Sequence, residues 1–108
     1  MADETTEQAQ KKTPRKPDPM TQLLNELKVQ IKAVENWDVK GIPAGRIEQY
    51  DRRASAWGRH YGQNGTLDGL ILSLAFEALA CYPQERRYSL VQLAAAALLA
   101  AEKLEPGK

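Results

Sequence analysis

The sequence predicts an all-α fold: a small, four-helix bundle-like domain with a disordered N-terminal tail. Four segments repeat apolar residues at the three- and four-residue spacing of a helix with one buried face. Prolines, glycines and helix-capping residues separate these segments. No segment alternates apolar and polar residues over any length, as a half-buried strand does. The chain of 108 residues therefore allows one domain built from helices.

Residues 1–17 are predicted to be a disordered tail, and the domain is expected to occupy residues 18–105. The tail is polar, contains two prolines, and changes from acidic to basic along its length. We expect it to act as a solubilising segment. A weak electrostatic arm for an anionic partner is the alternative.

The first helix is predicted to begin at Asp18 and Pro19, an N-cap acid followed by a proline at the first helical position. It is expected to end near Trp37, where the sequence over 36–43 is typical of a loop. Its apolar stripe comprises Met20, Leu23, Leu24, Leu27, Ile31 and Val34.

The second helix is expected to begin at Pro43 and to close at residues 62–65. Its apolar and aromatic residues fall within one narrow arc and predict a packing seam. That seam comprises Ile47, Tyr50, Ala54, Trp57 and Tyr61.

The third helix is expected to begin at the N-cap residue Thr66, and Tyr82 with Pro83 separates it from a fourth helix that runs to about Leu104. Both helices are apolar on most sides, so both must be buried on most sides. We expect them to pair as an antiparallel hairpin whose leftover face forms a homodimer or partner interface. The predicted core or interface anchors are Tyr50, Trp57, Tyr61, Leu98 and Leu99.

Cationic residues lie on both sides of the aromatic seam and at the start of the fourth helix. Guanidinium groups there are candidates for phosphate binding, either of a nucleic acid without sequence preference or of a nucleotide. The alternative is that these charges are only solvated. The candidates are Arg46, Arg52, Arg53, Arg59, His60, Arg86 and Arg87.

Glu77 shares an arc with apolar residues of the third helix. It is expected to reach solvent along the helix edge, or to pair with Arg53 or Arg46 of the second helix.

No catalytic residue, metal site or cofactor is predicted. One histidine and one cysteine cannot form a zinc cluster. Glu48 and Asp51 form an ExxD pattern similar to that of all-α, magnesium-dependent nucleotide pyrophosphohydrolases, but no ExxE precedes it. A surface ion pair between Glu48 and Arg52 is the preferred interpretation, and the hydrolase remains a second alternative.

A cytoplasmic protein is expected. Cys81 is the single cysteine and cannot form an internal disulfide, and residues 1–17 contain no apolar run that would form a signal peptide. The formal net charge of +1 argues against a strongly basic nucleic-acid coat.

We therefore expect a non-catalytic binding or regulatory module that works through helix-mediated protein–protein association, as a homo-oligomer and without a membrane. Nucleic-acid or nucleotide binding by the arginine-rich helix at 43–61 is the first alternative.

Overall fold

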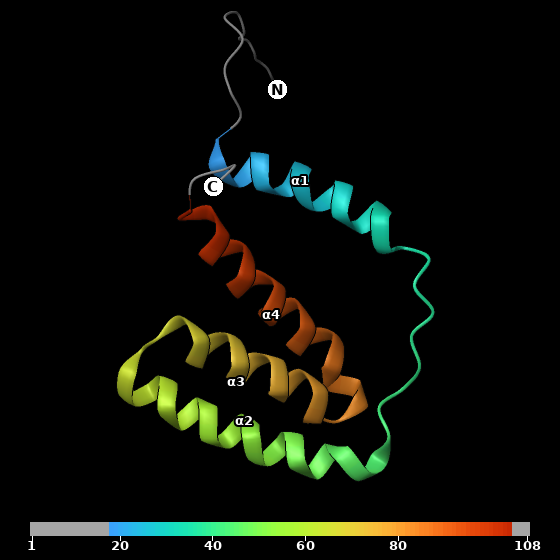
Figure 1. The fold of residues 1–108 in the computed structure, drawn as a ribbon, viewed down its shortest axis with the longest axis vertical. Helices are drawn as coiled ribbons and strands as arrows, with labels where there is room; N and C mark the ends of the chain where they lie inside the picture. The colour runs from blue at the N-terminus through green and yellow to red at the C-terminus, as the bar shows by residue number, and fades with distance from the viewer. Residues whose placement is uncertain (1–17, 105–108) are drawn as a thin grey trace, which may run out of the picture.

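The computed structural model describes residues 18–104, and within this range the chain forms four helices and no strand (Figure 1). This confirms the all-α, four-helix prediction. The predicted tail at 1–17 and residue 105 lie outside the described residues. The helices are α1 (Pro19–Val34), α2 (Ala44–Asn64), α3 (Leu67–Ala80) and α4 (Pro83–Glu102).

Helix α1 begins where the sequence predicts. The Asp18 carboxylate accepts a hydrogen bond of 2.8 Å from the Thr21 amide, and Pro19 holds the first helical position. The same bond lowers the pKa of Asp18.

Helix α1 ends at Val34, three residues before the predicted end near Trp37. The asparagine and aspartate beside Trp37 favour loop conformations, and Trp37 itself is 71% exposed, so no packing extends the helix. Residues 35–43 thus form a longer linker than predicted.

Helices α2 and α3 form an antiparallel pair closed by a tight turn, and their contact is the most extensive in the fold. Gly65 adopts φ 66°, a left-handed conformation that glycine accepts without steric cost, and its amide donates to the Tyr61 carbonyl at 2.8 Å. Thr66 then caps α3 by accepting from the Gly69 amide. Gly69 allows the two helices to approach closely, since a Cβ there would lie 3.3 Å from Tyr61 Cα.

The predicted aromatic seam of α2 is the face that packs on α3. Ala54 at its centre is buried, and the ring centroids of Tyr50 and Phe76 are 5.8 Å apart. A tilted aromatic pair of this kind contributes about 0.5–1.5 kcal/mol beyond its buried area. Trp57 is half-buried, whereas Tyr61 at the end of the seam is 38% exposed.

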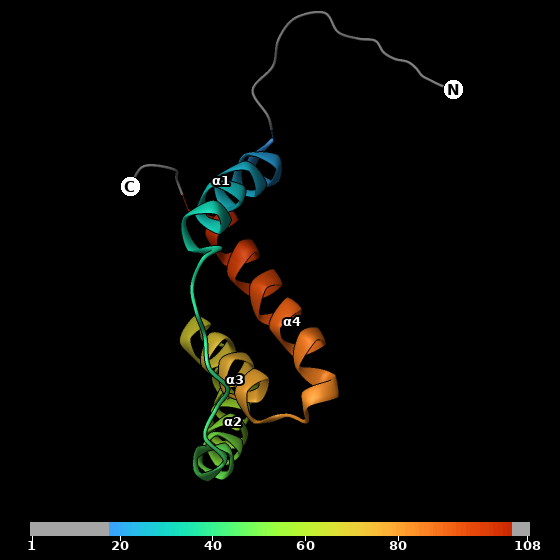
Figure 2. The ribbon, with the colours of Figure 1, turned by 90° about the vertical axis from the view of Figure 1, so that its right-hand side faces the viewer.

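Helix α3 lies between α2 and α4, and α4 diverges from it after the turn (Figures 1 and 2). Helices α3 and α4 do pack together, but the more extensive partner of α3 is α2. The α3-facing positions in the first turns of α4 hold the polar residues Arg86 and Ser89, so apolar packing starts only at Leu93. Helix α4 ends at Glu102, two residues before the predicted end.

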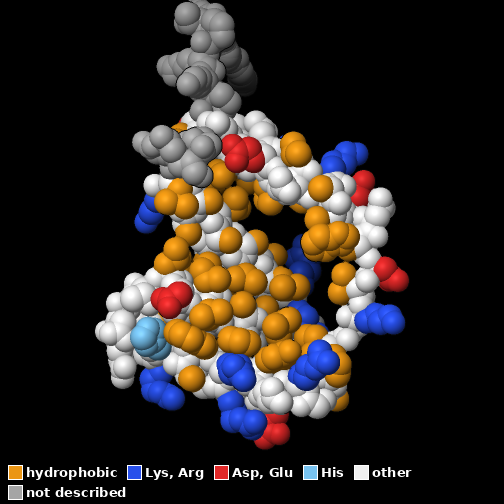
Figure 3. Space-filling model, in the orientation of Figure 1, with side chains coloured by type: hydrophobic (Ala, Val, Ile, Leu, Met, Phe, Trp, Pro, Cys, Tyr) orange, Lys and Arg blue, Asp and Glu red, His pale blue; other side chains and the backbone are white. Residues whose placement is uncertain are grey.

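Helix α1 contacts only α4 among the described helices. Figure 3 shows an opening bounded by α1, α4 and the linker. None of the residues of α1 is buried, and Leu24 and Ile31 of its apolar stripe are 42% and 50% exposed. Within residues 18–104, no element therefore buries the apolar stripe of α1.

Within residues 18–104, the buried apolar residues are only Ala54 and Ala78, and no large side chain is fully buried. A single copy therefore encloses very little apolar volume. None of the helices in this range combines the length and apolar character needed to cross a membrane.

Alanine substitutions at Gly58 and Gly69 test whether the backbones of α2 and α3 approach closely at Gly69. We expect Gly69→Ala to destabilise the fold by about 1 kcal/mol, because its Cβ would press on backbone that cannot move. Gly58 lies inside α2, and a Cβ added there would meet nothing within 4 Å, so Gly58→Ala should stabilise by about 0.5–1 kcal/mol. Urea unfolding followed by circular dichroism measures both, and equal shifts in the same direction would contradict the close approach.

Candidate functional site

Helix α4 carries an uncovered apolar surface. Residues 88–101 contain no charged side chain. Helix α3 covers one side of α4, where Ser89 is buried and Leu93 is half-buried. On the other sides, the exposed fractions are 67% for Tyr88, 46% for Leu90, 55% for Val91 and 53% for Leu99.

Three of these exposed residues, Tyr88, Val91 and Leu99, lie on one side of the helix, and Leu90 lies on another. Tyr88, Val91, Ala95 and Leu99 follow one another at steps of three or four residues, which places them on one side of a helix. The Gln92 amide donates to the Tyr88 hydroxyl at 3.3 Å, so these two polar groups satisfy each other within the helix. We call this surface the α4 face. Such a face is typical of a surface that another protein covers.

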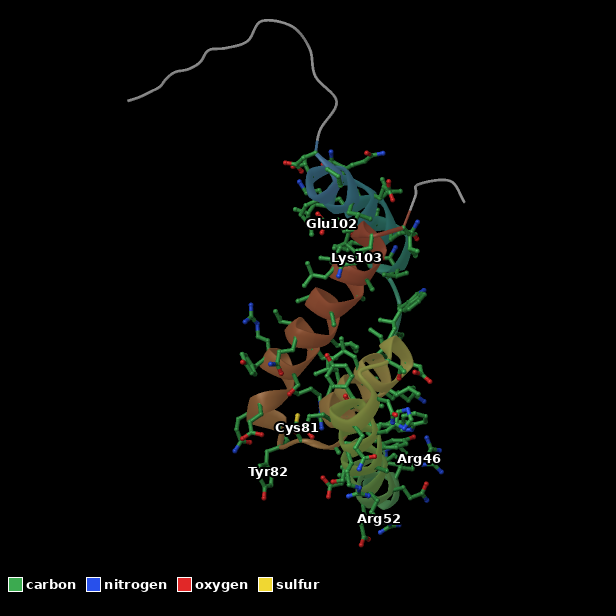
Figure 4. All side chains as sticks on the ribbon, turned by 90° about the vertical axis from the view of Figure 1, so that its left-hand side faces the viewer. Arg46, Arg52, Cys81, Tyr82, Glu102 and Lys103 are labelled. Carbon is green, nitrogen blue, oxygen red and sulfur yellow. The ribbon has the colours of Figure 1, made fainter. Side chains whose placement is uncertain are left out.

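The arginines of α2 lie on a different side of the molecule, and Arg46 and Arg52 point outward from the helix (Figures 3 and 4). Arg52 forms the expected ion pair with Glu48, at 3.1 Å. The Arg53 guanidinium carbon lies 6.0 Å from the centroid of the Phe76 ring, within the range of a cation–π contact.

His60 does not point outward from α2 as Arg46 and Arg52 do. Its ring is half-buried and meets the Trp57 ring edge-on, with centroids 5.3 Å apart. Its Nδ1 lies 3.2 Å from the Asn64 side-chain nitrogen, and its Cδ2 lies against the space that a Cβ on Gly69 would fill. His60 is therefore part of the packing at the α2–α3 turn.

Arg86 also has a role inside the fold. Its Nε donates to the Ala78 carbonyl at 3.0 Å, and one terminal nitrogen donates to the carbonyls of Leu79 and Cys81 at 3.4 and 3.1 Å. These are unpaired carbonyls at the end of α3, where a cation also opposes the helix dipole favourably. Charge alone places Arg86 among the anion-binding candidates. Arg86 follows Ala80, the last residue of α3, by six residues, so its long side chain can return to the end of α3 once the turn directs it there.

The seven cationic candidates are thus divided by the fold. Arg52 is paired with an acid. Arg53, His60 and Arg86 contact other residues of their own chain. Arg46, Arg59 and Arg87 are exposed and form no ion pair with a described residue.

The predicted pairing of Glu77 with Arg53 or Arg46 is wrong, because the only ion pair within residues 18–104 is Arg52–Glu48. Glu77 is exposed at the helix edge. It lines a shallow hollow of about 580 Å³ together with Glu48, Asp51 and Glu85. Across residues 18–104, no group of three or more histidine, cysteine or acidic side chains is arranged to hold a metal ion.

Asp68 lies in the first turn of α3, and its surroundings lower the pKa of its carboxyl group. Hydrogen bonding from the Thr66 side chain, then from the Gly69 amide, lowers the pKa of the Asp68 carboxyl, and His60 adds a smaller attraction. The Gly69 amide donates to the carboxylate at 2.9 Å. This acid stabilises the start of α3 in its charged form.

Comparisons with models of protein families, with curated proteins and with solved structures found no match.

The capping role of Arg86 can be tested against its neighbour. Arg86→Ala leaves three carbonyls without this donor and should lower the free energy of unfolding by about 1–3 kcal/mol. Arg87 is exposed, so Arg87→Ala should change stability by less than about 0.5 kcal/mol. Urea denaturation of the two variants measures the difference, and equal effects would contradict the assignment.

The Asp68 carboxylate should make stability depend on pH. Its folded-state pKa lies below the unfolded value of about 3.9, so its contribution is complete above that pH and is lost as pH falls through the folded-state pKa. Asp68→Asn should therefore lower the melting temperature at pH 5, and the gap to the wild type should narrow towards pH 3. Thermal melts by circular dichroism at several pH values measure this gap, and a constant gap would contradict the prediction.

Proposed function

We propose that this protein is a non-catalytic module for helix-mediated self-association, and that the α4 face is its principal contact surface. One observation supports this most directly. The segment 88–101 is uncharged and exposes apolar side chains on several sides, while its own chain covers chiefly the side towards α3. A helix that is apolar all round requires cover all round.

The chemistry of the α4 face suits a second copy of the same chain. In a twofold interface the same patch meets itself, so a charge near the twofold axis faces its own copy. The segment 88–101 has no charge to oppose, and its alanines permit close approach of two helix backbones. Burying the exposed leucine and valine side chains supplies the free energy, at about 25 cal/mol for each Å² of apolar surface removed from water.

The two alternative functions have fewer supporting features. Arg52 and Arg53 line one hollow on α2, but Arg52 is paired with Glu48, and His60 and Arg86 contact their own chain. For the magnesium-dependent hydrolase, Glu48 is engaged by Arg52. Glu77 and Glu85 line the same hollow as Glu48 and Asp51, but within residues 18–104 no three of these acids are close enough together to hold a metal ion.

Self-association predicts that a charge on the α4 face separates the copies. Val91→Glu should shift the mass measured by size-exclusion chromatography with light scattering from a multiple of 12.1 kDa to 12.1 kDa. Because position 91 is exposed and glutamate favours helices, the helix content should not fall.

Ser55→Glu is the matched control, since Ser55 is an exposed residue of α2 away from the α4 face. It should leave the mass unchanged. A wild-type mass of 12.1 kDa at all concentrations up to about 1 mM, where only the weakest associations escape detection, would exclude the proposal.

A further inference from the structure

We propose that the self-association is an exchange of N-terminal helices, in which α1 of one copy packs into the groove between α3 and α4 of a second copy. The inference rests on the proposed self-association and specifies which segment fills which site.

The groove is formed by the divergence of α4 from α3. It has a volume of about 550 Å³, and its lining is mostly apolar. The α3 wall contributes three leucines, and the α4 wall contributes mainly alanine and Leu99, so the groove has a large-residue side and a small-residue side. Its walls include Leu67, Leu70 and Leu74 of α3 and Ala96, Leu99 and Lys103 of the α4 side.

Helix α1 has the complementary surface. Its apolar stripe includes Leu24, Leu27 and Ile31, which are 42%, 37% and 50% exposed. A helix-in-groove interaction uses apolar anchors at this spacing. The three anchors are uncharged, and Lys103 is the only charged residue that lines the groove, so no like charges are brought together.

The connection to α1 permits such an exchange. Residues 35–43 contain no helix beyond a short turn at 35–36. Pro43 has φ −59° and ψ 135°, an extended conformation, and Ile42 before it is restricted to extended conformations by the proline ring. Nine extended residues span up to about 30 Å, which lets α1 reach beyond its own chain.

Interface area favours the second copy as the occupant. The uncharged part of α4 presents one helix face about 20 Å long and about 10 Å wide, which is about 200 Å². Each partner buries about 800 Å² in a stable interface of standard size. An additional apolar element is therefore needed, and α1 has the largest unburied stripe among the other helices. The groove adjoins the α4 face, and the two share Ala95 and Leu99. Helix α1 in the groove of its own chain adds no area between two copies, whereas α1 from a second copy extends the contact at the α4 face.

Disulfide trapping between two different variants tests the exchange. Both carry Cys81→Ser, which removes the only native cysteine. One adds Leu27→Cys on the α1 stripe, and the other, isotopically labelled, adds Leu74→Cys on the groove wall. After mixing, unfolding, refolding together and mild oxidation, mass spectrometry should detect a disulfide that joins a labelled chain to an unlabelled one.

Val29→Cys replaces Leu27→Cys in the control mixture, because Val29 lies on α1 away from the stripe and is 65% exposed. The cross-link should be lost in that mixture. Light scattering of the wild type is measured in parallel.

A multimer without the mixed disulfide would overturn the helix exchange and leave self-association standing. A variant carrying both Leu27→Cys and Leu74→Cys distinguishes the reason, since a disulfide within one chain would show that α1 fills its own groove and would also overturn the exchange. A monomeric wild type would overturn the proposed function and the exchange with it.

Discussion

The contact between α2 and α3 is the interaction on which the remaining structure depends. The left-handed glycine at 65 reverses the chain, Thr66 starts the next helix within one residue, and Gly69 brings the two backbones close together. All three features are local, so this pair can form from a short stretch of sequence with little loop entropy to overcome. The aromatic pair of Tyr50 and Phe76 then fixes the register of the helices.

Once α2 covers one side of α3, only the other side remains for α4. Arg86, in the first turn of α4, donates hydrogen bonds to three carbonyl groups at the end of α3. This arrangement ties the two helices at the turn through polar contacts, and apolar packing begins further along α4. The helices therefore diverge, and α4 is left with an uncovered face on one side and a groove towards α3 on another.

Local features were predictable from the sequence, whereas contacts between distant residues were not. The caps at Asp18 and Thr66 and the ion pair of Glu48 with Arg52 follow from spacings of three or four residues. The roles of Arg86 and His60 depend on where the end of α3 and the close approach at Gly69 lie in space, which spacing along one helix does not specify. The end of α1 is predicted only to within three residues, because the loop-forming residues at 36–43 show where the helix can no longer continue but do not specify its last turn.

The distribution of charge separates the surfaces of this protein by the interactions available to them. Arginines lie on the outer side of α2, acids surround the hollow beside Glu77, and residues 88–101 of α4 carry no charge. Charged surfaces are stable in water alone, so neither the arginines nor the acids require a partner. The apolar surfaces of α4 and α1 differ, because exposing them to water is unfavourable in proportion to their area. Helices α2 and α3 cover each other, whereas α1 and α4 carry most of the exposed large apolar residues. These two helices are therefore the elements whose packing the proposed self-association would complete.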